Sequence, residues 1–337
     1  MESTTSSRPL PRTLALLIVL GVLAAVLFSI VPASIFNWLG EKLNVFATIF
    51  LGIFIEAIPY LLLGTLASGL IEVFIDRTQM SRFIPSGSFT SALAGAVLGL
   101  AFPVCECGVI PLTRRLFHKG LPLPAGIAFL LAAPVFNPIV ILSTAAAFGW
   151  GKMLAWRVGL TLLIAVIVGL VFSVGKNDAT SILLPASVLH LEVQEDAPAS
   201  LLEKIRRALV IGADEFFEMG RYLVVGAILA AALQTFLPQG ALLAIGGGPL
   251  LSVLVMISLA FILSICSTVD AFVALGFVGT FSFGAVLSFL VFGPMVDIKT
   301  IIMYRQVFRT RTVVYLVVFP FLMSLLAGLT FNYFFPG

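Results

Sequence analysis

Three cysteines and one glutamate are the side chains of this sequence best suited to hold a ligand. Cys105, Glu106 and Cys107 are consecutive, and Cys266 lies in the second half of the chain. On a helix Cys105 and Cys107 would point to different faces, whereas in an unwound turn both sulfurs can converge. Thiolates prefer a soft, thiophilic ion or metalloid to a hard cation, so we interpret the cysteines as candidate substrate ligands. The alternative is that they are small buried residues that ease close packing.

Helix-breaking residues surround the triplet. Pro103, Gly108 and Pro111 flank it, and proline removes a backbone donor and restricts the residue before it. We therefore expect the helix to be broken here. Unwound backbone at membrane depth is tolerated only inside protein or beside a water-filled cavity. A carboxylate at such a place faces a pathway or a partner, so Glu106 is our first candidate for proton coupling.

A second pair of breaks is expected farther along each half of the chain. Pro134 and Pro138 bracket Asn137, and Pro294 lies in the corresponding part of the second half. Interrupted helices free backbone carbonyls and expose half-helix ends to a cavity. We expect both breaks to line the cavity, with Asn137 facing the substrate. The alternative is a pair of packing kinks, since proline is common in membrane helices.

The elements that position these residues must lie in a lipid bilayer. Of 337 residues, 60% are hydrophobic and only 10% are charged, against about 25% charged residues in soluble domains. This composition excludes a soluble globular enzyme and a disordered protein. A net charge of +3, carried by scattered residues, does not make a nucleic-acid-binding surface. Long charge-free runs suit helices, which satisfy their own backbone polar groups in lipid. We predict an all-α polytopic membrane protein.

Two copies of one unit are visible in the chain, as in many secondary transporters. The matches keep their order along the sequence: Glu56, Tyr60, Leu61 and Gly64 match Glu218, Tyr222, Leu223 and Gly226 at a shift of 162; Cys105 matches Cys266 at 161; residues 136–140 match 292–296 at 156; residues 169–172 match 328–331 at 159. We therefore expect the cysteines of both copies to meet where the two copies face each other.

Charge decides how the two copies are oriented. If the segments around Cys105 and Cys266 enter the membrane, break and return to the same side, only Lys42, Lys152 and Arg157 lie outside. Nearly all other basic residues are then cytoplasmic, which the positive-inside rule favours. Each copy has three spanning helices and a re-entrant hairpin, so the second copy is inverted. The N-terminus is then cytoplasmic and the C-terminus is outside.

The same reading divides the chain into four parts. We expect an N-terminal transmembrane helix over 1–42, a first transmembrane repeat over 43–175, a cytoplasmic linker with an amphipathic helix over 176–212, and a second transmembrane repeat over 213–337. The linker face of alternating apolar and charged residues is typical of a helix at a membrane interface.

Four more carboxylates and one arginine lie in apolar surroundings. Glu218 and Arg221 are one helical turn apart, so we expect them to pair with each other. The alternative is that Glu218 is a proton-coupling site and that both residues face the cavity. Glu56 is either interfacial or a proton carrier. Asp270 follows Cys266 by one turn and is our second candidate for proton coupling, whereas Asp297, close to Lys299, marks a boundary or faces the cavity.

Three motifs carry a resemblance to a known family. The run from Cys105 to Pro111, the segment 121–126 and the segment 132–138 resemble the predicted-permease family that includes the organoarsenical efflux permease ArsP. The resemblance covers most of the chain from about Leu43 onward. It implies a permease of the cytoplasmic membrane whose cysteines, Cys105 and Cys107 on the family motif, bind a trivalent arsenical. It implies no role for Cys266, which rests on the internal repeat alone.

These observations favour a secondary efflux permease for a small thiophilic solute, without a cofactor. The sequence has no GxxxxGK[ST] phosphate loop, so the chain does not use ATP directly, and proton antiport is a candidate for coupling. One alternative is an anion or metal-ion permease that uses half-helix dipoles; for an anion, Arg221 would assist. Others are a membrane thiol-redox enzyme, or a subunit of a larger complex. Beyond the bilayer and the solute, both a homo-oligomer and a partner subunit remain open.

Overall fold

The computed structural model describes residues 33–75, 85, 87–102, 104–174, 182–184, 200–236 and 248–334. These residues are mostly helical and form no β-strand beyond isolated bridges, such as the one between Leu183 and Phe308. The chain has two compact units, Met1–Thr48 and Ile49–Gly337. Of the first unit, only the start of the first described helix belongs to the described residues. All that follows concerns the second unit.

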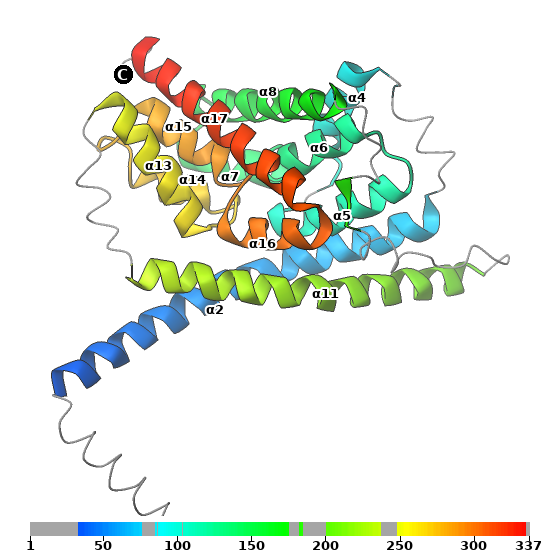
Figure 1. Cartoon of the computed structure of the whole chain (residues 1–337), viewed down its shortest axis with the longest axis horizontal. Helices are drawn as coiled ribbons and strands as arrows, with labels where there is room; N and C mark the ends of the chain where they lie inside the picture. The colour runs from blue at the N-terminus through cyan, green and yellow to red at the C-terminus, as the bar shows by residue number, and fades with distance from the viewer. Residues whose placement is uncertain are drawn as a thin grey trace, which may run out of the picture. The chain divides into compact units, whose positions relative to one another are not determined.

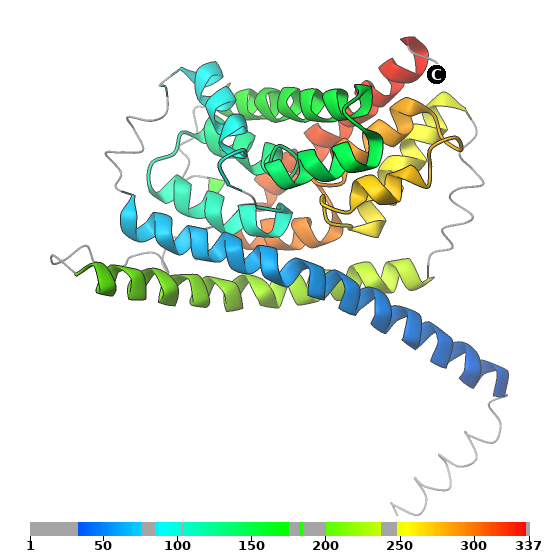
Figure 2. The same ribbon diagram turned by 180° about the vertical axis from the view of Figure 1, so that it is seen from behind.

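Twelve named helices follow one another along the described residues: α2 (Ala33–Phe74), α4 (Ser88–Leu98), α5 (Glu106–His118), α6 (Leu123–Ala132), α7 (Pro138–Phe148), α8 (Lys152–Val174), α11 (Leu201–Phe236), α13 (Pro249–Leu263), α14 (Asp270–Leu275), α15 (Phe283–Phe292), α16 (Ile298–Val307) and α17 (Thr310–Phe334). We call α2 to α8 the first half and α11 to α17 the second half. Figures 1 and 2 show their arrangement from opposite sides.

Four of these helices are long and apolar enough to cross a membrane: Asn37–Phe74 of α2, and all of α8, α11 and α17. A further five apolar helices are shorter, between 10 and 17 residues. Because a crossing needs about 20 residues, each half has two long helices rather than the three spanning helices predicted. The second predicted crossing of the first half is divided into α6 and α7 by a non-helical stretch over 133–137.

The core is built around one short helix from each half. Every residue of α6 is buried, and nine residues of α15 are buried. Helix α6 packs against α4 and α8, and α15 packs against α13 and α17. Because α6 and α15 are apolar on all sides, they are stable only when surrounded by other helices. The pieces of broken helix are thereby held inside the protein.

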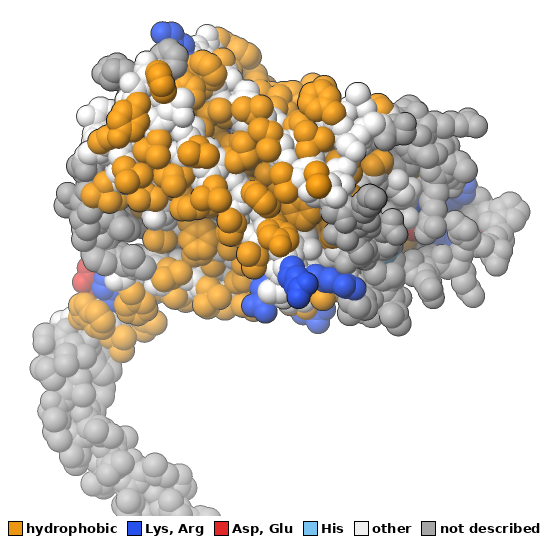
Figure 3. Space-filling view, turned by 45° about the horizontal axis from the view of Figure 1, so that its top comes forward, with side chains coloured by type: hydrophobic (Ala, Val, Ile, Leu, Met, Phe, Trp, Pro, Cys, Tyr) orange, Lys and Arg blue, Asp and Glu red, His pale blue; other side chains and the backbone are white. Residues whose placement is uncertain are grey.

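The outer surface suits contact with lipid. Figure 3 shows hydrophobic side chains over most of one face. Large apolar side chains are also exposed along the long helices, including Leu163 on α8 and Leu326 on α17. In water such contiguous exposure would be unfavourable, whereas in a bilayer it is the expected outer surface. The composition and the surface therefore agree on a polytopic membrane protein.

Helix α11 joins two parts that the sequence had separated. The amphipathic segment from Leu201 and the start of the predicted second repeat at residue 213 lie on one continuous helix of 36 residues. Residues 176–181 and 185–199 of the predicted linker lie outside the described residues.

Candidate functional site

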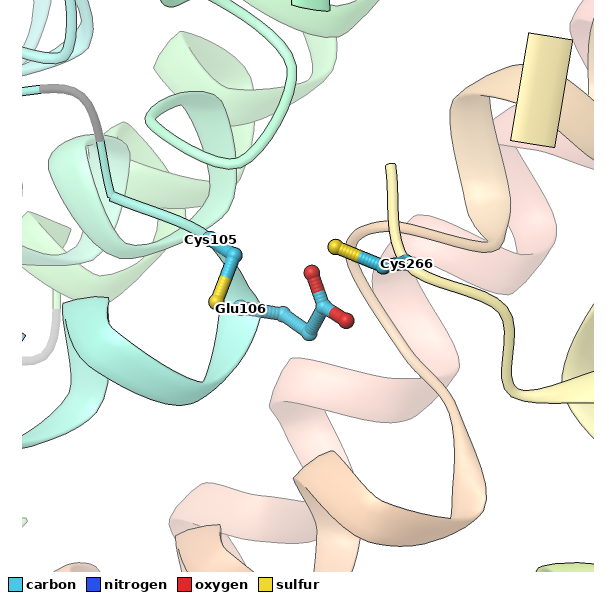
Figure 4. Close-up of side chains that lie close together, drawn as sticks. All are labelled: Cys105, Glu106 and Cys266. Carbon is cyan, nitrogen blue, oxygen red and sulfur yellow. The ribbon is translucent and has the colours of Figure 1, made fainter. Parts of the chain in front are cut away.

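Two thiols and a carboxylate from the two halves lie together inside the protein. The Sγ atoms of Cys105 and Cys266 and a carboxylate oxygen of Glu106 all lie within 4.8 Å of one another. All three residues are buried, with at most 4% of their surface exposed. Figure 4 shows the Glu106 carboxylate pointing into the space between the segments that carry the two cysteines. We call these three residues the thiol–carboxylate cluster.

Breaks between helices place the two cysteines of the cluster. After α4, turns and extended residues lead to Cys105, which is the N-cap of α5 with an extended backbone. In the second half, α13 ends at Ser264, whose φ of +46° is left-handed. A non-glycine residue in this conformation costs roughly 1–2 kcal/mol, so the surrounding packing must hold it. The chain then passes Cys266 and enters α14. The repeat match in the sequence pointed to this meeting of Cys105 and Cys266.

The predicted helix break at Gly108 and Pro111 is wrong, because α5 runs through both residues from Glu106 to His118. The break lies before the triplet instead. Neighbouring helices can compensate the backbone groups that a proline frees in a membrane helix. Gly108 has a packing reason, since a Cβ there would lie 2.9 Å from the carbonyl oxygen of Tyr60 in α2. Pro103 lies outside the described residues.

Cys107 is buried at 1% exposure as the second residue of α5. Its sulfur does not belong to the group of ligand atoms within 4.8 Å, although it neighbours Cys105. The side chains of Cys105 and Cys107 nevertheless interact directly, by a hydrogen bond between the two thiols. They meet at the N-terminus of a helix, not in the fully unwound turn that was expected.

The Glu106 carboxylate is paired with Lys299, a residue that the sequence analysis treated only as a neighbour of Asp297. Lys299 Nζ lies 3.5 Å from Glu106 Oε1 and 3.4 Å from Asp297 Oδ2, and both Lys299 and Glu106 are 2% exposed. Asp297 is the N-cap of α16, where its Oδ1 accepts hydrogen bonds from Thr300 N and Oγ1. The buried ammonium of Lys299 therefore lies between two carboxylates: that of Asp297, which is fixed by its hydrogen bonds, and that of Glu106, which is not fixed in this way.

Asp270 forms a second buried ion pair near the cluster. Its Oδ2 accepts a hydrogen bond from Arg157 of α8 at 2.6 Å, and Arg157 also donates to Thr144 Oγ1 at 2.8 Å. Arg157 is fully buried, which its predicted place on the outer side of the membrane did not indicate. A charge in apolar surroundings is retained only when a partner offsets its desolvation, and Asp270 is that partner.

A small pocket adjoins Cys105. It is lined by Tyr60, Asn137, Ser267 and Thr268, together with three apolar residues. Asn137 is the N-cap of α7: its Oδ1 accepts from Val140 N, and its Nδ2 donates to the Ala133 carbonyl. The amide therefore has a structural role at the pocket wall.

Hydroxyl groups complete the wall of this pocket. Ser267 is fully buried, and its Oγ has no hydrogen-bond partner among the described residues. Thr268 Oγ1 donates to Cys266 Sγ at 3.5 Å. The side chain of Glu56, half-buried on α2, interacts with Thr268 and with the charge of Lys299. Glu56 thus faces the cluster and its counter-ion.

Glu218 pairs with a different arginine from the one predicted. Its two carboxylate oxygens accept hydrogen bonds from Arg114 at 3.2 and 3.1 Å, whereas Arg221 is exposed on α11. An exposed Arg221 does not face the cluster. The predicted pairing within α11 is therefore wrong, because α5 brings a better placed cation between the long helices.

Arg114 is one of the basic residues that the sequence predicted to be cytoplasmic. In the structure it belongs to a buried ionic network. Glu215 Oε1 accepts from Arg114 at 2.9 Å and from Arg115 at 2.8 Å, and Glu72 of α2 contacts Arg115 and Lys119. The network fixes α5, and hence Cys105 and Glu106 at its start, between α2 and α11. The charges were visible in the sequence, but their partners on other helices were not.

The chain is similar to one protein family and to several known proteins. A family model described as predicted permease, ArsP_1, matches residues 42–333. UPF0718 protein YcgR of Bacillus subtilis is 45% identical over 274 residues, which cover 81% of this chain and 92% of the relative. A Streptococcus mutans protein, whose name proposes it as a subunit of a two-component membrane permease complex, is 36% identical over 280 residues, covering 82% and 92%. UPF0718 protein YraQ of Escherichia coli is 28% identical over 110 residues, 32% of either chain. No solved structure matches the chain significantly.

Proposed function

Since the chain belongs to the predicted-permease family ArsP_1, we propose that it is a secondary permease that exports a small thiophilic solute across the cytoplasmic membrane. The observation that carries this proposal is the thiol–carboxylate cluster, in which Cys105 of one half and Cys266 of the other lie in a single buried group. Non-helical backbone buried at membrane depth is how many transporters build a substrate site. A transporter fits both the family and the composition; an enzyme fits neither.

We further propose that the two halves are inverted copies that rock around the cluster. Support comes from their matching order of elements: a long helix, a short helix, a break with cysteine, two further helices, a second break, and a final pair ending in a long helix. Asn137 and Asp297 are both N-caps after the second break and both accept from the backbone three residues on. If these two N-caps correspond, Pro294 matches Pro134, and not Pro138 as in the match of residues 136–140 with 292–296 taken from the sequence. Inverted copies would put the N-terminus in the cytoplasm and the C-terminus outside.

A trivalent organoarsenical is the solute that the family resemblance suggests. Each cysteine thiol would exchange with one hydroxyl of the arsenical, forming an As–S bond and releasing one water, and the reverse exchange would free the solute. The hydroxyls of the adjoining pocket, above all Ser267, would hydrogen-bond the remaining polar group. Both thiols must reach one arsenic atom, which fits the closeness of Cys105 and Cys266.

Coupling to a proton gradient is part of the same proposal. Glu106 and Asp270 are the first residues of α5 and α14, and each is buried against a cation of the opposite half. Protonation of either carboxylate would release a contact between the halves. The alternative of an anion permease is weakened, because Arg221, which was expected to assist anion binding, is exposed. A partner subunit is suggested only by the name of the Streptococcus mutans relative.

The test is resistance of arsenical-sensitive cells that express the protein. The wild-type chain should protect against trivalent methylarsenical, and the Cys105→Ser, Cys107→Ser double variant should not. Ser91→Ala, which changes a buried hydroxyl on α4, is a control for expression and folding. Full protection by the double variant would overturn the thiol mechanism.

A further inference from the structure

The cluster contains a donor that a neutral arsenical does not use. Trivalent arsenic bonds to thiols, whereas a carboxylate beside two thiols is a donor set suited to thiophilic divalent cations. Glu106 Oε2 is buried and has no hydrogen-bond partner among the described residues. Its other oxygen has only the long 3.5 Å contact with Lys299. A buried carboxylate with an unsatisfied oxygen between two thiols calls for a ligand.

We propose that Cys105, Glu106 and Cys266 bind a divalent thiophilic cation, of the class of Zn²⁺ and Cd²⁺, and that the cation displaces the ammonium of Lys299 from Glu106. This inference rests on the proposed permease function and names the class of its solute. It assigns Lys299 as an internal counter-ion that occupies the carboxylate when no cation is bound.

The geometry needs only a small adjustment to hold such a cation. In tetrahedral zinc sites the Zn–S distance is about 2.3 Å and the Zn–O distance about 2.1 Å, so neighbouring donors lie roughly 3.5–4 Å apart. The three donor atoms of the cluster already lie within 4.8 Å of one another. Three protein ligands leave the fourth position open, as in zinc sites that exchange a ligand. An open position suits a solute that must leave again.

The charges around the site also fit a divalent cation. Each thiol releases its proton to solvent when it ligates the cation. Two thiolates and one carboxylate then carry three negative charges against two positive ones. Lys299 can remain on Asp297, 3.4 Å away, and offset the remaining charge. Asp297 is suited to this, because its other oxygen is fixed by two hydrogen bonds from Thr300.

Displacement of Lys299 would couple binding to movement of the halves. Glu106 begins α5 in the first half and Lys299 lies on α16 in the second, and the two helices pack against each other. Gly226 of α11 leaves no space behind α16, since a Cβ there would lie 2.9 Å from Lys299 Cα. A cation that takes Glu106 from Lys299 therefore changes a contact between halves. Such a differential contact is what allows a ligand to shift a conformational equilibrium.

The test is direct binding of Cd²⁺, Zn²⁺ and methylarsenite to the purified full-length protein in detergent, by equilibrium dialysis. The wild type should bind one Cd²⁺ per chain. Glu106→Gln should weaken Cd²⁺ binding at least about tenfold and leave methylarsenite binding within about threefold. Glu203→Gln, which removes an exposed charge on α11, should change neither.

A second variant tests the counter-ion. Lys299→Met removes the competing charge while keeping an unbranched side chain, so Cd²⁺ should bind tighter by about tenfold. If size-exclusion chromatography shows that Lys299→Met is unfolded, Cd²⁺ binding to the double variant Glu106→Gln, Cys266→Ser tests the cation site instead. Lys204→Met, at an exposed position of α11, is the matched control.

The outcomes separate this inference from the permease proposal. Binding of methylarsenite but not Cd²⁺, or Cd²⁺ binding that ignores Glu106→Gln, would overturn the cation site and leave a thiol-based permease. Binding of Cd²⁺ that depends on Glu106, without transport of either Cd²⁺ or methylarsenite in proteoliposomes, would keep the site and overturn the permease. Failure to bind any of the three solutes would overturn both.

Discussion

Arg157 Nη2 lies 2.6 Å from Asp270 Oδ2, in a contact that ties α8 of the first half to α14 of the second. Both residues are buried. Asp270 Oδ1 has no partner among the described residues, so the arginine carries most of the compensation for this carboxylate. The pair resembles the Glu106–Lys299 pair, because each joins the acid at the start of a short helix to a cation of the opposite half.

Replacing Arg157 alone should destabilise the protein more than replacing Arg157 and Asp270 together. Arg157→Met leaves a buried carboxylate without its cation, which should cost about 3–5 kcal/mol of unfolding free energy. The double variant Arg157→Met, Asp270→Leu should recover most of that loss. Unfolding of the purified protein followed by tryptophan fluorescence measures both, with Arg206→Met, exposed on α11, as the control. A double variant no more stable than the single one would contradict this account of the pair.

The contact between α2 and α5 should not tolerate a methyl group at Gly64. A Cβ there would clash with the backbone of Gly108, so the helices must separate, at a cost of roughly 1–3 kcal/mol. Because α5 begins with Glu106, we also expect Gly64→Ala to weaken solute binding. Gly52→Ala in the same helix meets nothing within 4 Å and should be neutral or stabilising. Equal thermal stability of the two variants would count against the packing described.

The ionic network between the long helices should depend on Glu215. Its Oε1 accepts from both Arg114 and Arg115, so Glu215→Gln leaves two buried guanidinium groups with weaker acceptors. Arg114 keeps Glu218 and Arg115 keeps Glu72, so we expect a loss of about 1–3 kcal/mol, and a much smaller one for Glu203→Gln on the exposed face. Thermal unfolding in detergent gives the comparison. An unchanged melting temperature for Glu215→Gln would show that the network does not hold α5 in place.

Substitution of Cys105 and substitution of Cys107 should have different effects on solute binding. Cys105→Ser removes a donor of the cluster and should reduce solute binding at least about tenfold, a change that corresponds to about 1.4 kcal/mol. Cys107→Ser should reduce it far less, because its sulfur lies outside the 4.8 Å group. Equilibrium binding of Cd²⁺ and methylarsenite to each single variant makes the comparison. Equal losses in both would restore the role that the sequence alone assigned to Cys107.

The sequence predicted the class of the fold and the neighbourhood of the site, and local patterns explain why. Apolar runs report burial in lipid directly, and the match of Cys105 with Cys266 pointed to two equivalent breaks. The break near Asn137 was visible because Pro134 and Pro138 act on their own backbone. The α5 helix was missed because packing against α2 outweighs the helix-breaking tendency of Gly108 and Pro111.

Partners between helices were beyond a reading of the sequence. Arg157 was assigned to the outer side and Lys299 to the cytoplasmic side, because a charge near the end of an apolar run gives the same pattern whether it faces water or a buried carboxylate. The difference is made by Asp270 and Glu106, each more than a hundred residues away in the chain. Opposite charges one turn apart on a helix, such as Glu218 and Arg221, suggest an ion pair within that helix. A cation from a neighbouring helix can take the place of the expected one, as Arg114 does for Glu218.

The closeness of Cys105 and Cys266 can be measured without knowing the solute. In a Cys107→Ser background these two are the remaining cysteines of the chain, and a protease site inserted between residues 184 and 200 would allow the halves to be cut apart. After mild oxidation in membranes and cleavage, we predict that the halves remain linked on a non-reducing gel, and separate when Cys266→Ser is added. Halves that separate in both proteins would contradict the claim that the two thiols share one site.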